Sequence, residues 1–251
     1  MSRMKANRFV AYFDMLGMGS AVKRNVDEAW GALSDLQATI NSDFGMRVGG
    51  KDIRLNDRVK KRLLSDTIVL FTLGDEVEDV WAITVLCSKM FMENLRRCVP
   101  LRGAIAHGEF YFNFDLDLIL GVPLVCACAL AEEAQWLGIT VDEVTADRVR
   151  TAFALVSKDP VVVEWPVPLK DGKCERKNVV NWPLPLRIRK NFTCPMRVED
   201  FYQAFEPLFG KFDSLKDRDQ LKYRNTVQFI NAQLDGPGFS KPVVVGDSVP
   251  R

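Results

Sequence analysis

Residues 9–17 constrain the fold most, because an unbroken apolar and aromatic run ends there at Asp14 and a glycine-bearing turn. A run that is continuously apolar, rather than alternating, is typical of a central strand buried on both faces. A carboxylate at the end of such a strand is costly unless its charge is compensated, and a metal ion is one compensator. The alternative is that Asp14 starts a loop or caps the next helix.

A second stretch, residues 63–71, predicts another apolar strand, with Asp66 inside it. Two such acids in one chain indicate a shared site. Up to about residue 137 the predicted elements follow the order β-α-β-β-α-β-α, the pattern of a ferredoxin-like domain with helices on one face of an antiparallel sheet. The sequence therefore predicts an α+β fold, in which the strand that carries Asp14 is central and pairs with the strand that carries Asp66. The patterns place helices at 24–42, 76–98 and 123–136, and strands at 47–55, 62–72 and 101–112.

The pattern of the sequence changes near residue 140, after which prolines interrupt several apolar segments. A helix is expected at 141–154, and the proline-punctuated segments 160–166 and 178–183 predict short edge strands. Residues 198–234 are expected to be helical, with an interruption near Gly210. We therefore predict one catalytic domain at 1–140 and a C-terminal extension at 141–251 that packs on it and is not an independent catalytic domain.

The composition of this chain limits the classes of partner that we expect it to bind. The 251 residues carry a formal net charge of +1, which gives no reason to expect nucleic-acid binding or docking on an anionic membrane. No apolar run approaches the roughly 20 residues that span a bilayer, and no apolar segment follows the N-terminus as in a signal peptide. We expect a cytoplasmic protein.

Paired hard-oxygen ligands with room for phosphate oxygens are how Mg²⁺ or Mn²⁺ is held in phosphoryl-transfer sites. If Asp14 and Asp66 lie side by side on the predicted sheet, they provide such a pair. The turn at 15–20 opens a helix and offers backbone N–H groups for a polyphosphate. These residues predict metal-dependent nucleotidyl transfer.

Four motifs resemble those of class III nucleotidyl cyclases. The segment FDMLG, residues 13–17, resembles the first metal motif of that family, and Ser65-Asp66 stands at the second metal aspartate. Residues 101–108 resemble the strand that follows, and residues 121–132 the next helix. The resemblance implies two Mn²⁺ or Mg²⁺ ions per site, bound by Asp14, Asp66 and the backbone carbonyl of Met15. It also implies that Phe13 lies along the nucleotide triphosphate.

Two positions depart from conventional adenylate and guanylate cyclases. Where those enzymes have an asparagine and, four residues later, an arginine that stabilises the transition state, this chain has Val125 and Ala129. Neither side chain forms hydrogen bonds. The purine-selecting lysine of adenylate cyclases, four residues before the second metal aspartate, is matched by Arg62, a weak candidate for a base contact. Arg102 is our candidate cation for the phosphates or the base, and the alternative is a surface arginine in a salt bridge.

The full pattern resembles the pyrimidine cyclases of Pycsar antiphage systems, which lack that Asn/Arg pair. This resemblance implies that UTP, with CTP as the second choice, is converted to its 3′,5′-cyclic monophosphate and pyrophosphate. It implies a homodimer with composite active sites and a separate effector that the cyclic nucleotide activates in antiviral defence. The rival hypothesis is a catalytically inactive cyclase-like module that binds a nucleotide or a partner. No residue spacing distinguishes uracil from cytosine.

Overall fold

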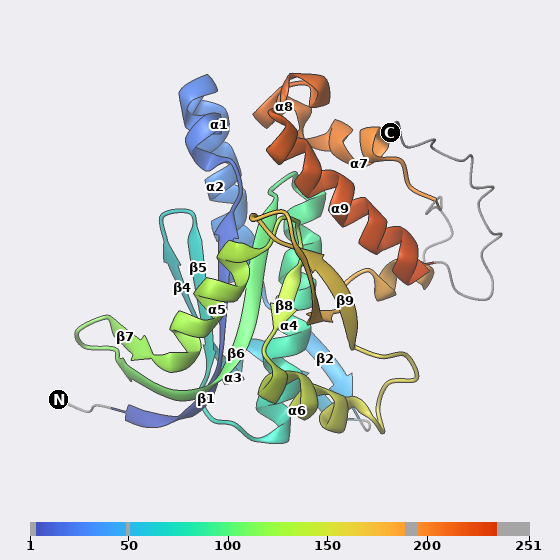
Figure 1. The fold of residues 1–251 in the computed structure, drawn as a ribbon. Helices are drawn as coiled ribbons and strands as arrows, with labels where there is room; N and C mark the ends of the chain where they lie inside the picture. Colours follow the sequence, from blue (N-terminus) through green and yellow to red (C-terminus); the bar gives the residue numbers. More distant parts are fainter. Residues whose placement is uncertain (1–3, 49–50, 189–194, 235–251) are drawn as a thin grey trace.

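A computed structural model describes residues 4–48, 51–188 and 195–234, and they form a mixed α+β structure around one eight-stranded sheet (Figure 1). The strands follow the order β4-β5-β1-β6-β8-β10-β9, and β7 pairs with β6. Their bounds are β1 Met4–Met15, β4 Val59–Leu64, β5 Thr67–Thr72, β6 Leu101–Asn113, β7 Leu118–Gly121, β8 Ile139–Val141, β9 Val162–Pro168 and β10 Cys174–Val180.

The helices surround this sheet. Their bounds are α1 Met18–Arg24, α2 Val26–Asn41, α3 Leu55–Arg58, α4 Val77–Arg96, α5 Val122–Glu133, α6 Glu143–Phe153, α7 Val198–Tyr202, α8 Glu206–Phe209 and α9 Asp217–Leu234. A separate hairpin, β2 Gly45–Val48 and β3 Lys51–Arg54, replaces the single strand predicted at 47–55, and residues 49–50 lie outside the described ranges. Within those ranges, no helix has both the length and the apolar character needed to cross a membrane.

Strand β1 lies in the interior of the sheet with a neighbour on each side, as the sequence predicts. It pairs antiparallel with β5 on one side and with β6 on the other, so that β4-β5-β1-β6 forms a ferredoxin-like arrangement. The apolar run at 9–13 explains this position, because its side chains alternate between the two faces: Phe9, Ala11 and Phe13 are buried on one face, and Val10 is buried and Tyr12 half-buried on the other. The prediction of an α+β fold is confirmed.

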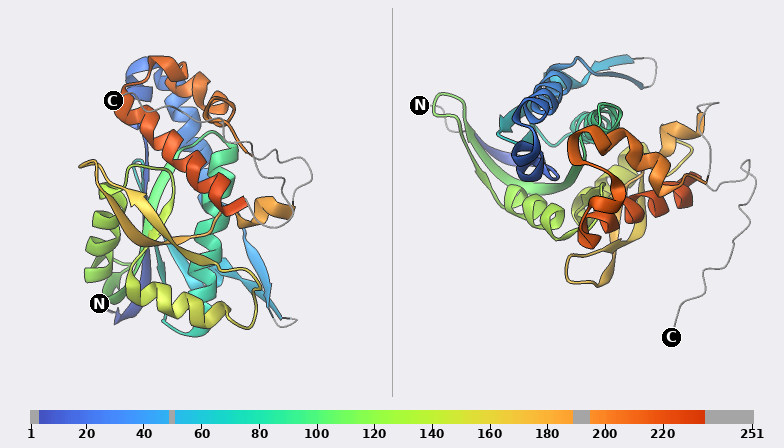
Figure 2. Two further views of the ribbon diagram at one scale, coloured as in Figure 1. Left: turned by 45° about the vertical axis from the view of Figure 1, so that its right-hand side comes forward. Right: turned by 90° about the horizontal axis from the view of Figure 1, so that it is seen from above.

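One detail differs from the prediction, which placed the helices on one face of the sheet. Helices α2 and α4 cover one face, and α5 covers the opposite face (Figure 2). Small side chains explain the position of α5, since Ala127 and Ala131 on the helix pack against Ala104 and Ala106 on β6. Because none of these residues extends beyond Cβ, the helix lies close to the sheet.

The chain after residue 141 continues the same sheet. The hairpin of β9 and β10 pairs with β8, and β8 pairs in parallel with β6. Helix α9 buries Phe229 among three tryptophans. Its ring centroid lies 5.0 Å from that of Trp136, 5.2 Å from that of Trp165 and 6.1 Å from that of Trp182. The predicted interruption is confirmed at Gly210, which ends α8 at a φ of 89°. The domain division at residue 140 stays a prediction.

Candidate active site

The two predicted acids lie at one end of β1. Asp14 is opposite Thr67 of β5 in the sheet register, and the N–H of Met15 donates to the carbonyl of Asp66 at 3.0 Å. Asp66 is not inside a strand, which corrects the sequence prediction: residues 63–71 form a hairpin, with Ser65 and Asp66 as its two-residue turn. The turn places a carboxylate at the sheet edge, where it reaches solvent, and so avoids burying its charge in a strand.

Arg102 faces Asp14 from β6. Its side chain is only 5% exposed, and its Nη2 donates to Oδ2 of Asp14 at 3.1 Å. Its Nη1 donates to the carbonyl of Ala134 at 2.9 Å and to that of Glu132 at 3.2 Å. Three acceptors therefore fix the planar guanidinium in one orientation beside the acid, which a single ammonium group does not reproduce. This is a buried pair and not the surface salt bridge that was the alternative.

The charge of Asp14 is balanced only in part by its surroundings. Burial raises the pKa of its carboxyl, the neighbouring Arg102 lowers that pKa, and the charge of Asp66 raises it again, with a net upward shift. Arg102 thus compensates the carboxylate only in part. A further cation beside Asp14 and Asp66 would stabilise both in their charged form.

The other predicted site residues are Phe13 and Met15, whose side chains lie on the face of the sheet opposite to that of Asp14. Both side chains are buried in the core, and a Cβ added at Gly103 would lie 2.3 Å from Cδ1 of Phe13. The aromatic ring therefore packs directly on the glycine backbone of β6. Neither side chain is therefore available to a ligand, so Phe13 does not present its ring to a triphosphate. The use of the Met15 carbonyl as a metal ligand stays a prediction.

A pocket of about 390 Å³ opens beside Asp14. Its walls come from Asp14, Leu16, Gly17, Arg102, Gln135, Lys170, Arg218 and Lys222. Sequence reasoning found Asp14 and Arg102 but missed the three basic residues from the C-terminal third of the chain. The only local signal was the spacing of Arg218 and Lys222, four residues apart on one predicted helix, which places them on the same face.

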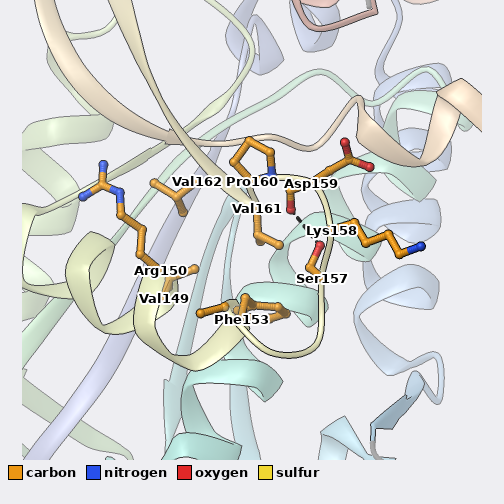
Figure 3. Close-up of a pocket in the computed structure, with 10 residues that line it drawn as sticks. Val149, Arg150, Phe153, Ser157, Lys158, Asp159, Pro160, Val161 and Val162 are labelled. Carbon is orange, nitrogen blue, oxygen red and sulfur yellow. Dashed lines mark hydrogen bonds between the residues drawn. The ribbon is translucent and has the colours of Figure 1, made fainter.

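The remaining sequence candidates lie elsewhere. Arg62 on β4 pairs with Asp117, Nε to Oδ1 at 2.6 Å, and does not line the pocket beside Asp14. Val125 and Ala129 lie on the exposed side of α5. A second pocket, of about 290 Å³, lies between α6 and β9 and includes neither Asp14 nor Arg102 among its lining residues (Figure 3).

No protein-family model matches the sequence, and the search of curated proteins found no match. Solved structures do match. The catalytic core of a rhodopsin-guanylyl cyclase with converted specificity, in complex with ATPαS, superimposes with a TM-score of 0.51 at 10% identity over 72% of this chain and 98% of that one. An adenylate cyclase from Trypanosoma brucei gives 0.50 at 10% identity, over 70% and 90%. The adenylyl cyclase CyaB from P. aeruginosa gives 0.48 at 15% identity, over 77% and 100%. The first two likenesses show that the chain has the class III cyclase fold.

Proposed function

We propose that the chain is a nucleotidyl cyclase that converts UTP, with CTP as the second choice, to the 3′,5′-cyclic monophosphate and pyrophosphate. The observation that carries this proposal is that Asp14 and Arg102 line one pocket on a class III cyclase fold, with Asp66 held next to Asp14 by the hydrogen bond from Met15, although Asp66 is not itself among the residues that line the pocket. A purely structural role gives no reason to keep an incompletely compensated carboxylate at a pocket wall.

The residues present fit a pair of divalent ions. Among the described residues no group of three or more His, Cys, Asp and Glu side chains is placed to hold a metal. Mg²⁺ in phosphoryl-transfer sites needs fewer protein ligands, because substrate phosphates and water complete its shell. Asp14, Asp66 and the carbonyl of Met15 would hold the ions, either Mn²⁺ or Mg²⁺. Bound there, they would lower the pKa of the ribose 3′-hydroxyl and neutralise charge on the departing pyrophosphate.

The protein contributes orientation and charge. Arg102 holds the carboxylate of Asp14 through Nη2 and is itself fixed by two backbone carbonyls, so both groups are arranged before the substrate arrives. Nucleophile and electrophile belong to one substrate molecule, and a pocket that folds the nucleotide correctly gains much of the rate by proximity. The new bond joins the 3′-oxygen to the α-phosphorus, and the bond from that phosphorus to the pyrophosphate oxygen breaks.

The pyrimidine preference and the role in antiphage defence are supported by the motif resemblance and by apolar Val125 and Ala129. A homodimer with composite sites is supported by the surface around Val125. Exposed apolar side chains gather there on β7 and the start of α5: Leu118, Leu120, Val122 and Val125. Such a patch favours burial against another protein surface, and a second copy of this chain would meet it.

The test of the proposed function is direct. The purified protein is incubated with Mn²⁺ and each of the four ribonucleoside triphosphates in turn, and products are identified by mass spectrometry. We expect cyclic UMP from UTP and none from ATP or GTP. A cyclic purine product would retain the cyclase and overturn the pyrimidine assignment.

A nucleotide-binding module without activity is the second candidate. The exposed Val125 and Ala129 favour it, because neither can stabilise charge in a transition state. Titration calorimetry with UTP and Mn²⁺, followed by product analysis of the same sample, separates the two candidates. Tight binding with intact UTP after overnight incubation would establish the module.

A further inference from the structure

The pocket beside Asp14 has an excess of positive charge. Four of its lining residues are basic and one is acidic. Three of the basic residues come from the C-terminal third: Lys170 follows β9, and Arg218 and Lys222 lie one turn apart on α9. Burial and the charge of Arg102 lower the pKa of Lys170. Like charges gathered in one hollow repel each other unless an anion binds between them.

The basic residues of α9 line two neighbouring hollows. The second, of about 230 Å³, shares Leu16, Gly17, Arg218 and Lys222 with the first pocket. The two hollows therefore adjoin between the turn at Gly17 and α9. A nucleotide with its α-phosphate near Asp14 would place its remaining phosphates beside Arg218 and Lys222, which line both hollows.

The two basic groups on α9 are available for a ligand to different degrees. The guanidinium of Arg218 is exposed and has no ion pair or hydrogen bond within the ranges that the structure describes. Lys222 is more enclosed, with its side chain 18% exposed, and its Nζ lies 2.8 Å from Oδ1 of Asp219. An ammonium has three donors, so this pair leaves two for another acceptor.

Helix α9 is fixed to the backbone that also holds Arg102. The side-chain amide of Gln135 donates to the carbonyl of Arg218, and that of Asn225 donates to the carbonyl of Gln135 at 2.8 Å. One residue before Gln135, the carbonyl of Ala134 accepts from Arg102. The positions of the basic groups on α9 are thus tied to the acid–arginine pair through a short stretch of chain. A site preorganised in this way loses little entropy on binding.

We propose that Arg218 and Lys222 bind the β- and γ-phosphates of the substrate, and the pyrophosphate that leaves, from within the same chain. This rests on the proposed function, which makes a nucleoside triphosphate the substrate. The subsite supplies positive charge to the leaving group in a chain whose α5 carries Ala129 at the position of the cyclase arginine. It also gives the C-terminal third a role in the site.

The test measures polyphosphate binding separately from turnover. Titration calorimetry follows pyrophosphate and UMP binding, with and without Mn²⁺, to the wild type, Arg218→Gln, Lys222→Gln and the double variant. We expect pyrophosphate to bind about tenfold more weakly to each single variant and more weakly still to the double variant. UMP affinity should not change, because UMP lacks the β- and γ-phosphates.

The matched control is Arg224→Gln, which removes an exposed arginine from the same helix outside both hollows. It should bind pyrophosphate as the wild type does. Arg218→Lys should recover part of the affinity, which a loss of folding would not allow. Equal pyrophosphate affinity in wild type and double variant, or no binding to either with or without Mn²⁺, would overturn the subsite.

Failure of the subsite and failure of the cyclase are distinguishable. If no triphosphate is turned over but pyrophosphate binding still depends on Arg218 and Lys222, the subsite stands and the enzymatic function falls. If UTP is cyclised with the same kcat/KM in the wild type and the double variant, the cyclase stands and the subsite falls.

Discussion

The pocket has two walls of opposite character. The strand wall is an ion pair, in which Arg102 is 5% exposed, Asp14 is 26% exposed and the two charged groups lie 3.1 Å apart. The helix wall consists of exposed Arg218 and of Lys222, whose side chain is 18% exposed, and its two positive charges outnumber their one acidic partner, Asp219. A paired wall has fixed geometry, whereas a wall with excess positive charge gains most when an anion arrives. Under the proposed function, we therefore expect the chemistry at the strand wall and the capture of phosphate at the helix wall.

The strand wall should therefore show the largest effect on turnover. We expect Asp14→Asn and Asp66→Asn each to reduce kcat by at least about a thousandfold, because an amide cannot replace a charged metal ligand at the reacting phosphate. Both variants should retain the wild-type circular dichroism spectrum. Asp57→Asn, on α3, is the control of the same chemistry and should keep full activity. A wild-type kcat in either site variant would show that the substituted acid has no part in catalysis.

Helix α9 can form a reliable wall only if it belongs to the core. Phe229 is fully buried against Trp136, and we expect Phe229→Ala to lower the free energy of unfolding by about 3–5 kcal/mol. Urea unfolding, followed by tryptophan fluorescence and circular dichroism, should show one transition for wild type and variant. Leu155→Ala, at a side chain 97% exposed, should cost about 0.5 kcal/mol or less. Two separate transitions in the wild type would show that the C-terminal third is an independent appendage.

The strand wall could be predicted from sequence because its signals are local. The apolar run before Asp14 indicated a central strand, and helical spacing indicated α4. The hairpin at Asp66 was missed, since Ser65 adopts a φ of 60° without the glycine that normally marks such a turn. Only two polar residues separate β4 from β5, so they appeared as one strand.

The helix wall could not be predicted in this way. Arg218 and Lys222 lie in a charged helix whose sequence gives no indication of which face meets the pocket. Their position depends on hydrogen bonds to Gln135, a residue more than eighty positions earlier, and on the burial of Phe229. β8 was missed for a related reason: it is three residues long and is defined by its pairing with β6 and β10. Long-range packing of this kind leaves no local pattern.

Arg102 connects the two walls, and a conservative change should show this. We expect Arg102→Lys to lower kcat/KM for UTP by about tenfold to a hundredfold, since a lysine keeps the charge but loses the planar fork that reaches Asp14 and two carbonyls together. Arg96→Lys, at an exposed pair on α4, should leave kcat/KM unchanged. If Arg102→Lys also left kcat/KM for UTP unchanged, the fixed orientation of the guanidinium would have no part in turnover.

Two tyrosines, one on the sheet and one among the C-terminal helices, allow the pH dependence of stability to be compared between the two regions. Burial raises the pKa of Tyr12 on β1 and of Tyr202 on α7 from 10.0 to about 12. The folded protein therefore holds each proton at a pH where the unfolded chain releases it. Stability from each phenol is complete below pH 10 and is lost between pH 10 and about 12, at about 1.4 kcal/mol per pH unit.

Tyr12→Phe and Tyr202→Phe should each flatten the alkaline fall in stability, measured by urea unfolding at intervals between pH 9 and 11. The loss of the hydrogen bond from Tyr202 to the carbonyl of Gly210 lowers stability at every pH and does not change this slope. If the two walls belong to one cooperative unit, both variants flatten the same transition equally. If only Tyr12→Phe does so, α7 and the helices packed on it unfold apart from the sheet, and the helix wall is then a mobile cover over a rigid strand site.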